Sequence, residues 1–173
     1  MNTKFKTVIK YLRIVFYIAI LATLVFIFVN SALPPDKSGE QSDRVSEIIS
    51  GIIPPDTDVG NFVITNIRKI AHFTEYGLLG VLVSLYVLIY TKNRVAWGFG
   101  SLMFALLVAF TDESIQIMSG RGPSIIDIWI DIGGFTTYAL LTYGSAVAIY
   151  YLVRLAMYIV KRTGRKNTNE NTN

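Results

Sequence analysis

Residues 14–35, IVFYIAILATLVFIFVNSALPP, contain no charged side chain. A transmembrane helix needs about 20 mostly apolar residues, because the hydrocarbon core is about 30 Å thick and each helical residue rises about 1.5 Å. This stretch is therefore long enough to cross a bilayer. Basic residues precede it, as in a secretory signal, but the uncharged run is longer than a signal's apolar region and no small-x-small cleavage site precedes Pro34. We interpret it as an uncleaved span.

Three more uncharged stretches have the character of membrane spans. They cover residues 76–91, with an extension upstream to Ile70, residues 95–111 and residues 132–153. Of the 173 residues, 52% are hydrophobic and 16% are charged, whereas about a quarter of an average soluble domain is charged. The sequence therefore predicts an all-α membrane protein, a bundle of four transmembrane helices.

Basic residues indicate how these spans are oriented. Eleven of the sixteen lie before the first span, between the second and third, or after the fourth: Lys4, Lys6, Lys10, Arg13, Lys92, Arg94, Arg154, Lys161, Arg162, Arg165 and Lys166. Cytoplasmic loops carry an excess of Lys and Arg. We therefore expect a multi-pass plasma-membrane protein with both termini in the cytoplasm and residues 34–67 and 112–126 outside. The net charge of +4 follows this membrane pattern, so we expect no nucleic-acid partner.

The first outer loop contains a predicted amphipathic helix. Its apolar residues recur at helical spacing: Val45, Ile48, Ile49, Ile52 and Ile53. We predict a short helix within residues 42–53 on the outer leaflet, either packed on the bundle or serving as a docking element. It should end at Gly51 and the following Pro-Pro pair. A second apolar run over residues 59–67 leads into the second span and is capped by Thr57 or Asp58.

We expect a single folded domain. Residues 1–162 hold the four spans, and the sequence has no internal repeat at a fixed period. Residues 163–173 are polar and rich in Asn and Thr, so they have nothing to bury and should form a disordered cytoplasmic tail. Cysteine is absent, which excludes disulfides, thiol nucleophiles and zinc–thiolate sites.

Polar residues cluster where the last three spans reach the outer surface. We call them the polar layer: Arg68, Lys69, His72, Glu75, Asp112, Glu113, Gln116, Arg121, Asp127 and Asp131. An ionised side chain inside a membrane is costly unless it faces a partner or water. Five acids and three bases leave an excess of negative charge. Such a cluster should bind a cation, accept a cationic ligand group or keep a carboxyl protonated.

A purely structural role is the alternative. Lys69 could neutralise Asp112, and Arg121 could neutralise Asp127, as ties between helices. A bundle this small can pack its helices with Gly and Ala at lower cost, so we favour a functional site for the cluster as a whole.

A single histidine narrows the chemistry available. Phosphatidic-acid-type phosphatases and multi-histidine metalloproteases need at least two histidines. A dyad of Ser119 or Ser124 with His72 stays open. So does an oxygen-rich metal site of Asp112, Glu113, Asp127 and Asp131 with His72. The catalytic candidates are His72, Glu75, Asp112 and Glu113, and no particular metal or cofactor is indicated.

The ordered motifs point to a family. They are Gln41-Ser42 with Val45, Lys69-x-x-His72-Phe73-x-Glu75-Tyr76 with Leu79, Asp112-Glu113-x-x-Gln116, and Gly120-Arg121 with Asp127. Together with four spans, this set resembles the VanZ family, small bacterial membrane proteins named from a glycopeptide-resistance cluster. The chain departs from the family at Asp131, where relatives often carry Asn. We rank Asp131 and Lys69 below the other ligand candidates, because we expect them to tune the charge of the site rather than to contact a ligand.

The resemblance implies a bacterial plasma-membrane protein that contributes to resistance to teicoplanin and other lipid-bearing glycopeptides, or to envelope homeostasis. The expected partners are the lipid bilayer and a lipid-linked wall precursor or lipoglycopeptide, and a homo-oligomer is left open. The ligand-binding candidates are Lys69, His72, Glu75, Gln116, Arg121, Asp127 and Asp131. The alternative is a membrane-embedded enzyme that uses acid–base or metal-assisted chemistry on a lipid-linked envelope substrate. Ion-coupled transport is disfavoured, because no charge lies at the midplane of a span.

Overall fold

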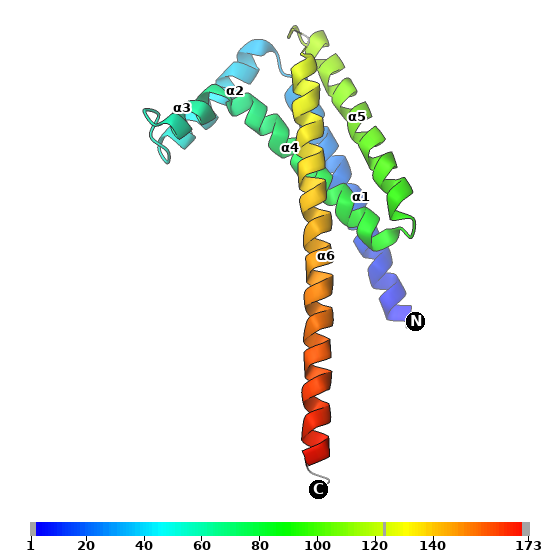
Figure 1. Ribbon diagram of the computed structural model, residues 1–173. Coiled ribbons are helices and arrows are strands. Elements are labelled where there is room, and N and C mark those ends of the chain that lie inside the picture. The colour runs from blue at the N-terminus through cyan, green and yellow to red at the C-terminus, as the bar shows by residue number, and fades with distance from the viewer. Residues whose placement is uncertain (1–2, 123, 171–173) are drawn as a thin grey trace. The chain divides into compact units, whose positions relative to one another are not determined.

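The computed structural model describes residues 3–122 and 124–170. This part of the chain is helical and contains no strand (Figure 1). The helices are α1 Thr3–Ser31, α2 Pro35–Ser50, α3 Asp58–Thr65, α4 Ile67–Tyr90, α5 Arg94–Met118 and α6 Ile125–Glu170. The all-α architecture predicted from the sequence is confirmed. Two compact units divide the chain, residues 1–139 and residues 140–173.

Four helices are long and apolar enough to cross a membrane. These segments are Thr7–Ser31, Ile67–Tyr90, Val95–Met118 and Ile125–Lys161. They include the four stretches predicted from the absence of charge, apart from residues 32–35 and Thr91, and they extend further. The difference arises because backbone hydrogen bonding continues through polar residues such as His72 and Asp112, where the uncharged runs stop.

The predicted amphipathic helix in the first loop is present but begins earlier. α2 starts at Pro35 rather than Ser42, because proline suits the first helical turn, where its missing N–H would have no partner anyway. It ends at Gly51, as expected. For α3, the cap is Thr57, whose hydroxyl oxygen accepts the Gly60 N–H at 3.0 Å.

The apolar face of these short helices is largely uncovered by protein. Val45, Ile48 and Ile52 are exposed, as are Val59 and Phe62 of α3. α2 contacts both α3 and α4, so it is attached to the first unit through part of its surface. Contact of these apolar side chains with a lipid leaflet stays a prediction.

The interior of the first unit contains polar as well as apolar side chains. α1, α4 and α5 pack against one another in pairs, around Ile27, Leu79 and Ala109. Buried polar residues include Asp112 and Asp131. Most large apolar side chains of the spans are exposed, as expected where lipid rather than protein surrounds the bundle.

Glycines allow α4 to approach the first turns of α6 closely. A Cβ atom on Gly134 would overlap the backbone carbonyl of Phe73, and one on Gly80 would overlap that of Phe135. Small residues at such crossings let helix backbones touch. This crossing brings the α6 residue Asp131 to the level of His72 on α4.

The turn after α5 is closed by a left-handed glycine. Gly120 has φ of 86°, and the N–H groups of Gly120 and Arg121 donate to the carbonyls of Ile117 and Gln116. This is the Schellman pattern of helix termination. It reverses the chain and directs Arg121 back toward α1.

The second unit is the remainder of α6, and its described apolar side chains are largely exposed, for example those of Leu152 and Val160. Residues 163–170, where the sequence predicts a disordered tail, continue this helix. Residues 171–173 lie outside the described part of the chain. The disorder of this tail in solution and the single domain over residues 1–162 stay predictions.

Candidate functional site

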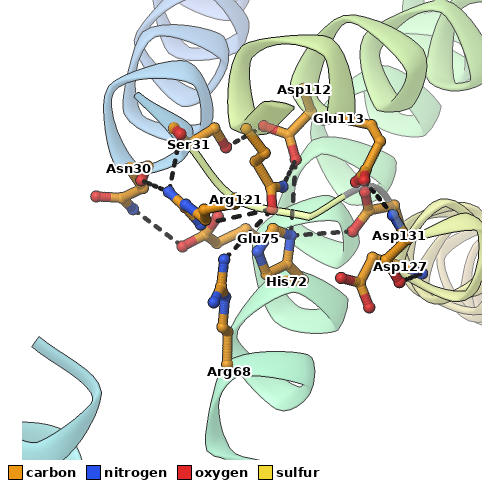
Figure 2. Close-up of polar contacts among 12 residues, drawn as sticks. Asn30, Ser31, Arg68, His72, Glu75, Asp112, Glu113, Arg121, Asp127 and Asp131 are labelled. Carbon is orange, nitrogen blue, oxygen red and sulfur yellow. Dashed lines mark hydrogen bonds and ion pairs between the residues drawn. The ribbon is translucent and has the colours of Figure 1, made fainter. Parts of the chain in front are cut away.

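The polar layer centres on one histidine and two aspartates from three helices. His72 lies on α4, Asp112 on α5 and Asp131 on α6, and Figure 2 shows both carboxylates directed at the imidazole. His72 Nδ1 is 3.3 Å from Asp131 Oδ1 and 3.7 Å from Asp112 Oδ2. The side chains of Asp112, Asp131 and His72 are 0%, 2% and 12% exposed. Ionisable groups thus meet in a space that excludes most water.

Three buried polar atoms at this centre make no hydrogen bond within the described residues. They are His72 Nδ1, Asp131 Oδ1 and the Tyr76 hydroxyl. Tyr76 is fully buried one turn beyond His72, and its hydroxyl interacts electrostatically with both aspartates. Such atoms are uncommon, because an unpaired buried polar group costs about 1–3 kcal/mol.

Asp112 is held in place from two sides. The Ser31 hydroxyl, at the end of α1, donates to Asp112 Oδ1. Gln116 Nε2, one turn along α5, donates to Asp112 Oδ2 at 3.0 Å. The neighbouring residue of α1, Asn30, donates from Nδ2 to Glu75 Oε1 at 3.1 Å. The end of α1 thus orients an acid on each of two other helices.

Arg121 caps the end of α1. Its Nη2 donates to the carbonyls of Asn30, Ser31 and Leu33 at 2.8, 2.8 and 3.0 Å, and its Nε donates to Leu33 at 3.2 Å (Figure 2). The last carbonyls of a helix have no partner within it, so the guanidinium satisfies them. Burial, together with the nearby charge of Arg68, lowers the pKa of the Arg121 guanidinium below its ordinary value. An arginine nevertheless keeps its proton in proteins.

Arg68 is held more loosely. Its single hydrogen bond within the described residues runs from Nη2 to Gln116 Oε1 at 3.4 Å, and Arg121 Nη1 reaches the same oxygen at 3.5 Å. The Gln116 amide therefore links the two guanidinium groups to Asp112. Arg68 therefore keeps donors that a ligand in either cavity could use.

Two cavities of about 220 Å³ each lie beside His72. The α2 cavity is lined by Phe26, Asn30, Ser38, Gln41, Ser42, Val45, Ile67, Arg68, Ala71, His72, Glu75 and Arg121. The loop cavity is lined by Thr65, Asn66, Arg68, Lys69, His72, Gln116, Arg121, Gly122 and Asp127. Both cavities are lined by Arg68, His72 and Arg121. The same basic side chains can therefore contact a ligand in either cavity.

An apolar groove adjoins the α2 cavity. This α1–α4 groove has a volume of about 410 Å³ and is lined by Ala22, Thr23, Phe26, Thr74, Glu75 and Leu78. Phe26 and Glu75 line both the groove and the α2 cavity. A polar space and an apolar channel along two membrane helices therefore meet at these residues.

The structure places the other predicted site residues around this centre. Glu113 accepts the Ser124 N–H at the start of α6 and lines neither cavity. Lys69 and Asp127 both line the loop cavity. Within the described residues, no ion pair joins Lys69 to Asp112 or Arg121 to Asp127, the two ties considered as structural alternatives. Asp131, ranked low from the sequence, lies nearest to His72.

The sequence reasoning missed the contribution of α1. Asn30 and Ser31 hold Glu75 and Asp112, but they sit at the end of an uncharged run that was interpreted only as a span. The adjacent pair of polar residues at the end of an apolar helix was the available signal. It could not identify the partners, which lie 45 and 81 residues away in the chain.

Chemically, the centre offers one imidazole nitrogen and carboxylate oxygens within a few ångströms of one another. Nδ1 of His72 and one oxygen each from Asp112 and Asp131 all lie within 4.8 Å of one another. Such a set can share a proton or bind a cation, and both cavities give access to it through the His72 side chain.

Comparison with protein families identifies the chain's relatives. The VanZ/LLP1 family pattern matches residues 14–156, which is most of the chain. The chain belongs to the VanZ/LLP1 family. Neither the curated proteins nor the solved structures compared with it gave a match. The resemblance stated from the sequence motifs is thus confirmed.

The VanZ/LLP1 match covers the whole polar layer. It includes Asn30 and Ser31 at the end of α1 as well as the last acid of the cluster, Asp131. The centre described above therefore lies within the part of the chain that defines this VanZ/LLP1 protein as a family member.

Proposed function

We propose that this VanZ/LLP1 protein binds an amphipathic ligand of the bacterial cell envelope, or a lipoglycopeptide, at an outward-facing polar site. It thereby contributes to tolerance of teicoplanin-type antibiotics or to envelope homeostasis. The observation that carries the proposal is the junction at Phe26 and Glu75, where the polar α2 cavity meets the apolar α1–α4 groove.

The junction fits a molecule with a polar head and an acyl or prenyl chain. The head would occupy the α2 cavity, where Arg68 has donors available and Gln41 and Ser42 add uncharged polar groups. The chain would lie along the groove, against Ala22 and Leu78. Burial of apolar chain and contact with a few polar groups are the usual basis of such binding.

The site also suits the proposed topology. The distribution of basic residues predicts that the α2 segment and the turn at Arg121 lie outside a bacterial plasma membrane, with both termini in the cytoplasm. Lipid-linked wall precursors and the acyl tail of a lipoglycopeptide meet the membrane at this depth. The partner class is therefore consistent with the position of the two cavities.

The test blocks the groove without touching the polar layer. Ala22→Phe fills the groove, and Ala148→Phe makes the same change at an exposed position of α6. Each variant is expressed in a deletion host, and its membrane level is measured together with susceptibility to teicoplanin and vancomycin. We expect wild type and Ala148→Phe to raise the teicoplanin tolerance of the host. Ala22→Phe, present in the membrane at a normal level, should not raise it. If Ala22→Phe raises tolerance as much as wild type does, the proposal is contradicted.

The second candidate function is enzymatic, and one observation favours it. His72 lines both cavities while two buried carboxylates face its Nδ1 atom, an arrangement suited to acid–base or metal-assisted chemistry. Turnover of a lipid-linked precursor by protein in nanodiscs, followed by mass spectrometry and lost with His72→Gln, would favour this function over binding alone.

A further inference from the structure

We propose that His72, Asp112 and Asp131 bind one divalent transition-metal ion, of the Mn²⁺ or Zn²⁺ class. The inference stands apart from the proposed function, because it concerns only these three side chains and does not depend on which ligand enters the cavities.

The spacing of the donor atoms matches metal coordination. A tetrahedral ion with ligands about 2.1 Å away separates them from one another by about 3.4 Å. Nδ1 of His72 is 3.3 Å from Asp131 Oδ1 and 3.7 Å from Asp112 Oδ2. The ligand atoms of all three residues lie within 4.8 Å of one another. Small side-chain adjustments would complete a three-ligand site.

Unpartnered buried atoms are the second, independent observation. His72 Nδ1 and Asp131 Oδ1 are 3.3 Å apart, within ion-pair distance, but within the described residues neither atom makes a hydrogen bond of good geometry. Asp131 is 2% exposed, so its carboxylate is shielded from bulk water. A metal ion accepts lone pairs from both atoms at once, so each atom would then have a bonding partner.

The surrounding charges leave the two carboxylates undercompensated. Within the described residues, the ion pairs of Asp112 and Asp131 involve only His72. Arg121 directs its donors mainly to three carbonyls at the end of α1. When both buried carboxylates are ionised, their charge exceeds that of one imidazole, and a divalent cation would neutralise the excess.

Supporting contacts fix the proposed ligands. Ser31 and Gln116 donate to the two oxygens of Asp112, and the Gly134 crossing holds α6 against α4. Outer hydrogen bonds of this kind orient metal ligands and raise their affinity. His72 also lines the α2 and loop cavities, from which water or a ligand oxygen can complete the coordination shell.

The donor set favours a transition metal and narrows the site predicted from the sequence. An imidazole nitrogen suits Zn²⁺ and related ions, whereas Ca²⁺ and Mg²⁺ prefer oxygen-only sites. Glu113 accepts a backbone N–H of the turn, and Asp127 lines the loop cavity. Neither belongs to the group of three whose atoms converge.

The test uses full-length protein in nanodiscs, purified with a tag that contains no histidine and stripped of metal by a chelator. Mn²⁺ is titrated in, and the loss of the free-ion electron paramagnetic resonance signal gives the stoichiometry and affinity. We expect one Mn²⁺ per chain, with Zn²⁺ displacing it. Because His72 is the only histidine, a nitrogen coupling in the pulsed spectrum of bound Mn²⁺ identifies it as a ligand.

Matched variants locate the site. Asp131→Asn should weaken Mn²⁺ binding by at least about tenfold, since even supporting residues of metal sites have effects of this size. Asp43→Asn makes the same change at an exposed position of α2 that lines neither cavity, and it should leave the affinity unchanged. Helicity and monodispersity are checked for each variant, and His72→Gln replaces Asp131→Asn if that variant does not fold.

Three results would overturn the inference. They are failure of wild type to bind either Mn²⁺ or Zn²⁺, absence of nitrogen coupling from bound Mn²⁺, and equal weakening by the two Asp→Asn variants. The wild-type measurements alone can do this, so the inference does not depend on the folding of any variant.

Discussion

The guanidinium of Arg121 donates to three backbone carbonyls at the end of α1. The carbonyls of Asn30 and Ser31 also accept from the Leu33 N–H and the Ser119 hydroxyl, whereas that of Leu33 accepts both Nε and Nη2 of Arg121. A planar group with five donors can do this, whereas a lysine ammonium has three donors at one point. The motif Gly120-Arg121 was predicted from the sequence to belong to a binding site. Its largest set of contacts is instead a helix cap, although Arg121 also forms part of the wall of both cavities.

Arg121→Lys therefore tests the cap while keeping the charge. We expect the free energy of unfolding to fall by about 1–3 kcal/mol, because the Leu33 carbonyl loses both bonds from Arg121 and those of Asn30 and Ser31 lose one each. Arg68→Lys is the control. Arg68 makes one long hydrogen bond of 3.4 Å, so this substitution should lower the free energy of unfolding only slightly. Thermal unfolding in the same detergent gives both values. If Arg68→Lys lowers the free energy of unfolding as much as Arg121→Lys does, the contacts of Arg121 with the end of α1 do not stabilise the protein specifically.

Sequence alone could not rank the members of the polar layer. The spacing of Arg68, His72 and Glu75 on one helix predicted a shared face, and these residues do line one cavity. The closest approach, between His72 and Asp131, depends on how two helices cross, and helical periodicity contains no information about that. Asp131 was ranked low because relatives often carry Asn at this position and because it was expected to tune charge, and helical periodicity gave no reason to rank it higher.

At the scale of the helices, the decisive contact is the crossing of α4 with the first turns of α6. Gly134 touches the Phe73 backbone so closely that no Cβ fits, whereas a Cβ on the adjacent Gly133 would meet only the Phe73 ring at 3.9 Å. The helices themselves were predictable, because an apolar run of about 20 residues has few alternatives in a membrane. The crossing was not predictable, because a glycine alone does not mark a close contact: Gly98 and Gly144, for example, face open space.

Gly134→Ala should push α6 away from α4 and separate Asp131 from His72. Overpacking of this kind costs about 1–3 kcal/mol. Gly133→Ala adds the same methyl group one residue away at ordinary contact distance and should be neutral or slightly stabilising, because alanine is the better helix former. The measurement is the melting temperature of each purified variant. If the two variants have the same melting temperature, the backbone contact at Gly134 does not determine how closely α6 packs against α4.

At the scale of the whole molecule, the distribution of charge predicts the topology. Four spans would put both ends of the chain on one side of the membrane, and the basic residues predict that this side is cytoplasmic. Apolar length and charge bias are properties of the whole chain, which is why they can be obtained from the sequence without knowing any contact. The identity of the ligand depends on shape, and the sequence cannot supply it.

Single cysteines test this topology directly, since the natural chain has none. Lys37→Cys, in the α2 segment, should react in intact cells with a maleimide that does not cross membranes. Lys92→Cys, between α4 and α5, should react only after the cells are permeabilised. The two positions are both lysines near helix ends, so they are matched. If Lys92→Cys is labelled in intact cells, the protein has the opposite orientation to the proposed one.

The position of Asp131 on the last span has a consequence for biosynthesis. Ribosomes make the chain from its N-terminus, so α1, α4 and α5 are complete before α6 exists. His72 and Asp112 are thus translated before their third partner, which follows Asp112 by 19 residues, or about 1–4 seconds of translation. Until α6 is made, His72 and Asp112 lack their third partner. The last helix to be synthesised is therefore the one that completes the buried cluster.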